Sequence, residues 1–127
     1  MIFPLKSQQS DHRVCVIDGD PAVRDSLQYL CGSQGYPAIG FSTCAAFLRM
    51  LDQQMCARSV ICEAQLPDGS GLELFQELRR RGLQMPFALM MSRVSLPALT
   101  HATRLGVEYV WPKPLVDRAP LIQFLDG

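Results

Sequence analysis

Residues 14–24 read Val-Cys-Val-Ile-Asp-Gly-Asp-Pro-Ala-Val-Arg, and their order determines how the rest of the chain is interpreted. The four apolar residues 14–17 have the length and composition of a strand that is covered on both faces of a sheet. A polar turn, 18–20, ends this run, and Pro21 suits the first turn of a helix. A buried strand that leads through a short turn into a helix is typical of an α/β protein with a parallel sheet.

The same alternation continues along the chain. Further strands are expected at 38–41, 60–62, 87–91 and 107–111. Helices are expected after Pro21, after the cap-like Ser42, after the capping box Ser70-x-x-Glu73, at 97–105 before Gly106, and at 117–125. These elements predict a doubly wound α/β fold of (βα)5 type with a five-stranded parallel sheet.

Length and composition indicate one compact domain. The chain has 127 residues, of which 48% are apolar, so one core needs neither disulfides nor a structural metal. We expect a domain at 13–127 and a loose arm at 1–12, because the apolar start is short, contains Pro4 and is followed by a polar run. That start is also too short for a membrane span.

Charge and cysteine content restrict the partners and the compartment. Twelve basic residues balance twelve acidic ones, so no net field draws the domain to nucleic acid or to a membrane. The five cysteines include no C-x-x-C pair and lie mostly in apolar segments. This pattern favours buried thiols in the cytoplasm over disulfides or a zinc site.

Polar residues follow four of the predicted strands. They are Asp18-Gly19-Asp20, Glu63, Ser92 and Lys113-Pro114. In an open parallel sheet the carboxyl ends of the strands share one edge, and reacting groups gather there. A polar cluster is therefore expected at this edge.

The segments 14–24, 63–74 and 105–114 carry a resemblance to a known family. Over roughly 13–125 the chain resembles the receiver domain of response regulators, most closely receivers of the FixJ and NarL type that precede a helix-turn-helix. The resemblance implies a CheY-like (flavodoxin-like) fold with strand order 2-1-3-4-5, and a role in two-component signal transduction.

The resemblance also assigns roles to the strand ends. In that family an acidic pair holds magnesium, an aspartate accepts the phosphoryl group, and a hydroxyl residue and a lysine contact it. On this chain the acidic pair falls on Asp18 and Gly19, the phosphoacceptor on Glu63, the hydroxyl on Ser92 and the lysine on Lys113.

Two of these positions depart from the family pattern. Gly19 removes one charged ligand from a metal that requires near-octahedral oxygen ligation, and Asp20 is one residue further on and points elsewhere. The extra methylene of Glu63 shifts the carboxylate by about one bond length, and a misplacement of about 1 Å can lower a transfer rate about a hundredfold. We therefore expect no phosphorylation, and at most weak magnesium binding at Asp18 and Asp20.

A third departure concerns the switch position. The family usually carries Tyr or Phe three residues before the lysine, where this chain has Val110. Tyr109 and Trp111 alternate to the other face of the strand and do not replace the aromatic residue. Pro112 donates no amide, which an edge strand tolerates.

The sequence thus predicts an atypical receiver, not an enzyme, that acts in signal transduction or transcription regulation by protein contact. By resemblance, the face of the fourth helix, fifth strand and fifth helix would contact an output domain, a partner or a second copy, through residues such as Leu99, Arg104, Val110 and Leu121. No direct nucleic-acid binding is expected. A Glu63–Lys113 ion pair either mimics phosphorylation or is a relic of the family's site.

Two alternatives remain. The chain could still be phosphorylated if Asp18 and Asp20 held the metal. The Asp-x-Asp of the first strand also looks like the first motif of haloacid-dehalogenase-type phosphatases, with Asp18 as nucleophile, although no later acidic pair is present to hold that family's magnesium. The run 79–81 of three arginines is interpreted as a solvated helix end, not as a nucleic-acid site.

Overall fold

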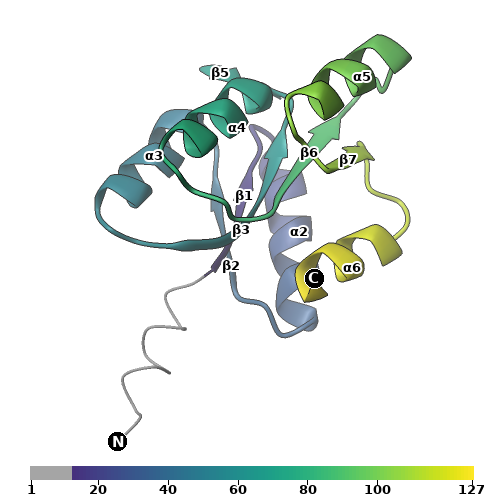
Figure 1. The fold of residues 1–127 in the computed structure, drawn as a ribbon. Coiled ribbons are helices and arrows are strands. Elements are labelled where there is room, and N and C mark those ends of the chain that lie inside the picture. Colours follow the sequence, from purple (N-terminus) through teal and green to yellow (C-terminus); the bar gives the residue numbers. More distant parts are fainter. Residues whose placement is uncertain (1–12) are drawn as a thin grey trace, which may run out of the picture.

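A computed structural model describes residues 13–127 of the chain. The arm predicted at 1–12 lies outside the described residues. The centre is a parallel sheet in the order β2-β1-β3-β6-β7 (Figure 1), which is the predicted order 2-1-3-4-5, since β4 and β5 form a separate short hairpin. The strands are β1 (Arg13–Ile17), β2 (Ala38–Phe41), β3 (Ala57–Glu63), β6 (Phe87–Met91) and β7 (Tyr109–Pro112).

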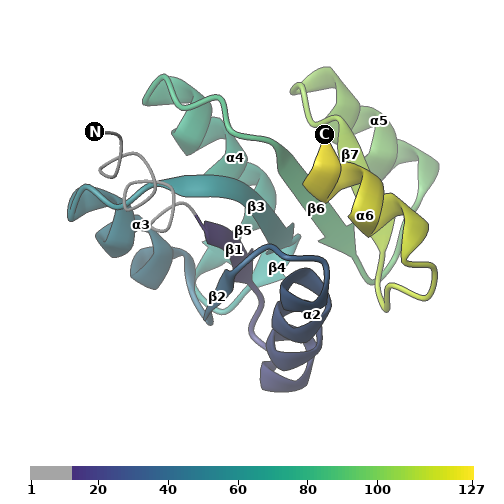
Figure 2. The same ribbon diagram turned by 90° about the horizontal axis from the view of Figure 1, so that it is seen from below.

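Helices cover both faces of this sheet (Figures 1 and 2). On one face, α2 (Pro21–Ser33) and α6 (Ala119–Asp126) share a core cluster with alternate residues of the strands. On the other, α3 (Cys44–Asp52), α4 (Gly71–Arg80) and α5 (Leu96–Arg104) enclose a second cluster. The fully buried central strands explain their near-continuous apolar sequence.

Helix starts follow local capping chemistry, with one correction. The capping box at α4 is confirmed, because Ser70 Oγ accepts from the Glu73 amide and Glu73 Oε1 accepts from the Ser70 amide. The cap of α3 is Thr43 and not Ser42 as expected; Thr43 Oγ1 accepts from Ala46 N at 3.1 Å. Either hydroxyl suits an N-cap, so composition alone does not separate two adjacent candidates.

Several element ends differ from the sequence prediction. β3 begins at Ala57, three residues earlier than expected, and includes Glu63 as its last residue. The hairpin of β4 (Gln65–Leu66) and β5 (Gly69–Ser70) was not predicted. β7 starts two residues later than expected because the turn at Gly106, whose φ is +104°, continues through the buried Val107.

Arg79 is half-buried, which corrects the interpretation of 79–81 as a solvated helix end for this residue; Arg80 and Arg81 are exposed as expected. Its guanidinium donates to the Leu83 and Met85 carbonyl oxygens at 2.8 and 3.0 Å and lies 4.5 Å from the centre of the Phe75 ring. Arg79 therefore holds the loop between α4 and β6 in place.

The cysteines are only partly as expected. Cys15, Cys31 and Cys62 are buried, whereas Cys44 is half-buried and Cys56 is exposed. Burial raises the pKa of Cys15 to about 12 and that of Cys31 to about 11, so these thiols are inert packing groups. None of the helices in the described part of the chain has the length and apolar character needed to cross a membrane.

The start of α4 requires a glycine, which gives a test of the fold. A Cβ at Gly71 would lie 2.4 Å from the Glu63 carbonyl oxygen and 2.8 Å from Leu89 Cδ1, whereas a Cβ at Gly32 would meet nothing within 4 Å. Gly71→Ala is expected to lower the free energy of unfolding by about 1–3 kcal/mol or more. Gly32→Ala, inside α2, should be neutral or raise it by up to about 1 kcal/mol. Urea unfolding compares the two, and equal stabilities would contradict this packing.

Candidate functional site

Three of the predicted site residues meet at the carboxyl edge of the sheet. Asp18 follows β1, Glu63 ends β3, and Lys113 follows β7. Lys113 Nζ lies 2.6 Å from Glu63 Oε2 and 2.9 Å from Asp18 Oδ2. The predicted Glu63–Lys113 pair is thus confirmed, and Asp18 is a second partner of the lysine that the sequence did not indicate.

Lys113 is placed by the edge strand that precedes it. Its amide donates to the Met91 carbonyl oxygen at 2.9 Å, which fixes the chain just beyond β7 against β6. Its side chain is 14% exposed. Burial lowers the pKa of Lys113, but hydrogen bonds and attraction to Glu63 and Asp18 outweigh it, so this pKa is raised above its ordinary value. The ammonium is therefore permanently charged at neutral pH.

Asp18 is fully buried and has the most constrained carboxylate of the site. Its Oδ1 accepts from the Asp20 amide at 2.8 Å and from Lys113 Nζ at 3.1 Å. Its Oδ2 accepts no aligned hydrogen bond, although the ammonium is close. Burial raises the pKa of Asp18, repulsion from Glu63 adds to this, and the bonds from Asp20 and Lys113 oppose it.

Glu63 bridges two strand ends. While Oε2 contacts Lys113, Oε1 accepts a hydrogen bond from the Gly19 amide at 3.2 Å. The added methylene of glutamate lets the carboxylate reach the turn between β1 and α2. Gly19 thus contributes its backbone amide to the site in place of a side-chain ligand.

Asp20 takes no part in this cluster through its carboxylate. Its Oδ1 accepts from the Ala22 amide at 3.0 Å, so the side chain caps α2, as an aspartate at this position commonly does. Using Asp20 as a metal ligand would require its side chain to leave the start of α2.

These residues do not fit the magnesium ion that the resemblance implies. The lysine ammonium lies against both carboxylates, and Gly19 supplies no oxygen ligand. Among residues 13–127 no group of three or more His, Cys, Asp or Glu side chains is arranged to hold a metal. A divalent ion requires several oxygen ligands at short distance and would compete with Lys113 for the oxygens of Asp18 and Glu63.

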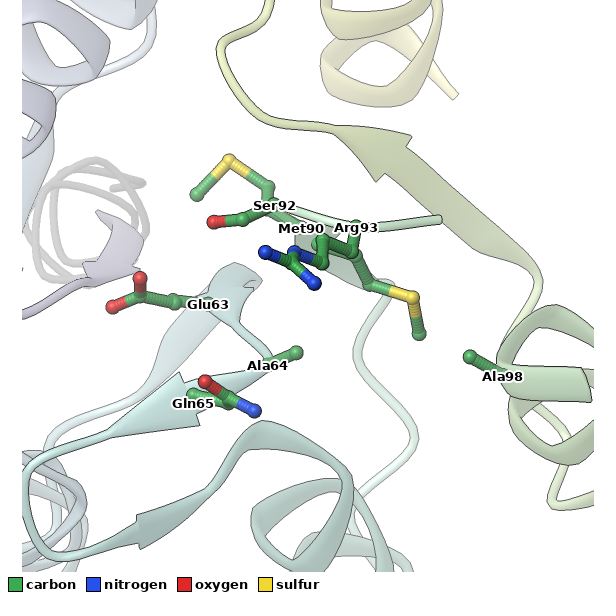
Figure 3. A pocket seen from close by; sticks show the side chains of 8 residues that line it. Glu63, Ala64, Gln65, Met90, Ser92, Arg93 and Ala98 are labelled. Atoms are coloured by element: carbon green, nitrogen blue, oxygen red, sulfur yellow. The ribbon is translucent and has the colours of Figure 1, made fainter. Parts of the chain in front are cut away.

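Ser92 stands apart from the ion-paired cluster. It is exposed and lines, with Glu63, a pocket of about 280 Å³ between the ends of β3 and β6 and the start of α5 (Figure 3). None of the contacts that join Asp18, Glu63 and Lys113 includes it. Arg93 also lines this pocket, and sequence reasoning did not single it out because it belongs to no strand-end motif.

The side chains of β7 alternate as predicted. Val110 is half-buried and packs on the cluster beneath α3, α4 and α5. Tyr109 and Trp111 pack against Phe124 of α6 on the other face, with ring centres 4.9 and 5.2 Å from it. Neither Tyr109 nor Trp111 therefore lies on the face of β7 that Val110 occupies.

The prediction that Leu121 belongs to an interface is wrong. Leu121 is only 1% exposed and belongs to the core under α6, so it is not available for contact with a partner. The periodicity of α6 is compatible with several apolar faces, and only packing shows which one is buried. Leu99 and Arg104 of α5 are exposed.

Comparison with known proteins identifies similar domains. Residues 14–126 match the family model of the response regulator receiver domain. The chain is 36% identical to the transcriptional regulatory protein FixJ of Azorhizobium caulinodans over 109 residues, 84% of this chain and 50% of that protein. It is 27% identical to the response regulator protein TodT of Pseudomonas putida, over 80% of this chain and 44% of that protein. The chain spans about half the length of these curated relatives.

Solved structures agree with the fold. A response regulator receiver protein from Pseudoalteromonas atlantica superposes with a TM-score of 0.77 at 26% identity, covering 90% of this chain and 97% of that one. The structure titled FixJ-N superposes with a TM-score of 0.76 at 22% identity, covering 91% and 90%.

The ion-paired cluster predicts unequal effects of its two charge deletions. In Glu63→Gln, Lys113 still neutralises Asp18, so the free energy of unfolding should fall by about 1 kcal/mol or less. Lys113→Met leaves the buried Asp18 beside Glu63 without a counter-charge, and a loss of about 3 kcal/mol is expected. Glu77→Gln, which breaks the ion pairs of Glu77 with Arg80 and Arg81 at the end of α4, is the matched control. Urea unfolding at neutral pH measures all three.

The pH dependence gives a second readout of the same pair of variants. Because burial raises the pKa of Asp18, the folded state takes up a proton more readily than the unfolded chain as the pH falls. Protonation removes the uncompensated charge, so the stability gap between Lys113→Met and the unchanged protein should narrow on acidification. A gap that is small at neutral pH or constant with pH would contradict the buried role of Asp18.

Proposed function

The chain belongs to the family of response regulator receiver domains, and we propose that it is an atypical member that works without phosphorylation. In this proposal the domain is not an enzyme, does not depend on magnesium, and transmits information through protein contacts. One observation carries it: Lys113 is held by Glu63 and Asp18, so the site is already complete without a phosphoryl group.

The geometry around Glu63 argues against phosphoryl transfer. Both oxygens of its carboxylate are engaged, one by the Gly19 amide and one by Lys113. A nucleophile must reach an in-line position within about 3–3.5 Å of the reacting atom, and a Glu63 oxygen would have to give up one of these contacts to attack. The lysine that would stabilise transferred charge is likewise occupied.

Retained phosphorylation and phosphatase chemistry have less support. Both would use Asp18 with Asp20, but Asp18 is fully buried and Asp20 caps α2. A phosphatase nucleophile must be reachable by its substrate, and a metal shared between these two aspartates would require the Asp20 side chain to leave the helix end.

Two features support mimicry of a phosphorylated state over a relic. Glu63 draws Lys113 and the turn after β1 together, so the ends of three strands are joined. Lys113 also stays charged at neutral pH, because its pKa is raised by its hydrogen bonds and attraction to the two carboxylates. The mimicry is partial, because a glutamate carries one negative charge where a phosphoryl group carries nearly two.

The output is proposed to pass through the exposed face of α5 and β7, with Leu99 and Arg104 among its contacts. The domain has no net charge, and its arginines at 79–81 form no basic surface of their own, so nucleic acid is not the proposed ligand of this domain. The FixJ relatives are named transcriptional regulatory proteins, which supports a role in transcription control.

Phosphorylation is the direct test. With acetyl phosphate and magnesium, intact-mass spectrometry should detect no added phosphoryl group. Gly19→Asp with Glu63→Asp should restore the modification, since a Cβ at Gly19 would lie at an ordinary 3.4 Å from Pro67. Each single change should do little. A stoichiometric gain on Glu63 or Asp18 of the unchanged protein would overturn the proposal.

Mimicry is tested by association. If the Glu63–Lys113 pair sets an active arrangement, Glu63→Gln and Lys113→Met should both alter self-association in sedimentation at several concentrations, with circular dichroism unchanged. Glu77→Gln again serves as a control away from the site. Unchanged association in both variants would leave Glu63 as a relic on a constitutive scaffold.

A further inference from the structure

The peptide group between Asp18 and Gly19 is hydrogen-bonded at both of its ends. The Asp18 carbonyl oxygen accepts a hydrogen bond of 2.7 Å from Nη1 of Arg24, a half-buried residue of α2. The Gly19 amide donates to Oε1 of Glu63 at 3.2 Å. This peptide bond is trans, so its carbonyl and its amide point in opposite directions. Arg24 and Glu63 therefore hold one planar unit from opposite sides.

The charges of Arg24 and Glu63 match the dipole of this peptide group. A peptide unit has a dipole of about 3.5 D, with its negative end at the carbonyl oxygen and its positive end at the amide. The guanidinium lies at the negative end and the carboxylate at the positive end, so each contact polarises the peptide in the sense that strengthens the other. Arg24 forms no ion pair with a carboxylate in the described part of the chain, so its charge is not neutralised there by an acidic side chain.

Gly19 makes the orientation of this peptide group easy to lose. Without a Cβ, glycine tolerates a wide range of φ, so rotation of the peptide plane costs less here than before another residue. A rotated plane would turn the amide away from Glu63 and bring the carbonyl oxygen toward its carboxylate, which is repulsive. Within residues 13–127, the bonds from Arg24 and to Glu63 are the hydrogen bonds that this peptide group makes.

We propose that Arg24 is a positioning residue, which orients the peptide between Asp18 and Gly19 so that the Gly19 amide meets Glu63. Arg24 acts through the peptide, because no hydrogen bond or ion pair within residues 13–127 joins it to Glu63 directly. The importance of the Glu63 contact for signalling rests on the proposed function, whereas the orienting effect of Arg24 does not.

The edge strand β2 leaves room for the stem of this arginine. A Cβ at Gly40 would lie 3.2 Å from Arg24 Cδ and 2.7 Å from Gln28 Oε1. The side chains of these two α2 residues thus lie close over the glycine, but Gln28 makes no hydrogen bond to the turn after β1 within the described residues. Gln28 is therefore a matched control for Arg24.

The test is proton–nitrogen NMR of the Gly19 amide. Arg24→Met keeps an unbranched stem and removes the charge and the donors. In this variant the Gly19 amide proton should move upfield and exchange with water about fivefold faster, a change that corresponds to about 1 kcal/mol for one hydrogen bond. Arg24→Lys, which keeps a charged donor, should restore most of the slow exchange. Gln28→Met should leave both quantities unchanged.

A second measurement leaves Arg24 in place, in case Arg24→Met does not fold. Glu63→Ala removes the acceptor at the other end of the peptide, and the Arg24 guanidinium should then rotate severalfold faster in nitrogen NMR. Unchanged rotation, an unchanged Gly19 amide in a folded Arg24→Met, or an equal change in Gln28→Met would overturn the proposal. Phosphorylation of the unchanged protein would refute the proposed function and leave the effect of Arg24 on Gly19 in place.

Discussion

The ammonium of Lys113 between two carboxylates is the interaction on which the arrangement of this edge depends. Asp18 has no exposed surface, and a buried carboxylate is tolerated only with a counter-charge and hydrogen bonds. Lys113 comes from beyond the edge strand β7, so the contact ties that edge to the centre of the sheet. In the proposed function, these contacts keep the lysine from responding to a new charge at the site.

Glycine at 19 and glutamate at 63 are physically coupled. A Cβ on Gly19 would stand 3.9 Å from Glu63 Oε1, so a carboxylate at 19 would lie against that of Glu63. Like charges at such a distance disfavour ionisation of one of the pair. Without that side chain the Gly19 amide is open to Glu63, which accepts a hydrogen bond from it. The two departures from the family pattern therefore fit one another, because each makes the other less unfavourable.

Local patterns in the sequence predict the strands and the capping box at Ser70, and the family resemblance implies the order of the strands and the site positions of Glu63 and Lys113. These patterns do not predict contacts between segments that are distant in the sequence. Asp68, in the turn of the β4–β5 hairpin, accepts hydrogen bonds from the amides of Cys44 and Ala45 at the start of α3. These residues are more than twenty positions apart in the sequence. The ion pair between Asp18 and Lys113 and the burial of Leu121 also depend on how the elements pack. The periodicity of the sequence does not determine that packing.

The side chains of β7 bear on the proposal that the domain binds its partner constitutively. A switch requires an element with two arrangements of similar free energy, which a ligand then biases. On β7, Val110 is a small side chain and not an aromatic ring that could rotate between two positions. Tyr109 and Trp111 are held by edge-on packing against Phe124. Under the proposed function the strand ends hold no chemical trigger, and β7 offers no bistable side chain beside them. The concentration of the partner, and its complementarity to the exposed apolar residues around α5, then decide when the domain is engaged.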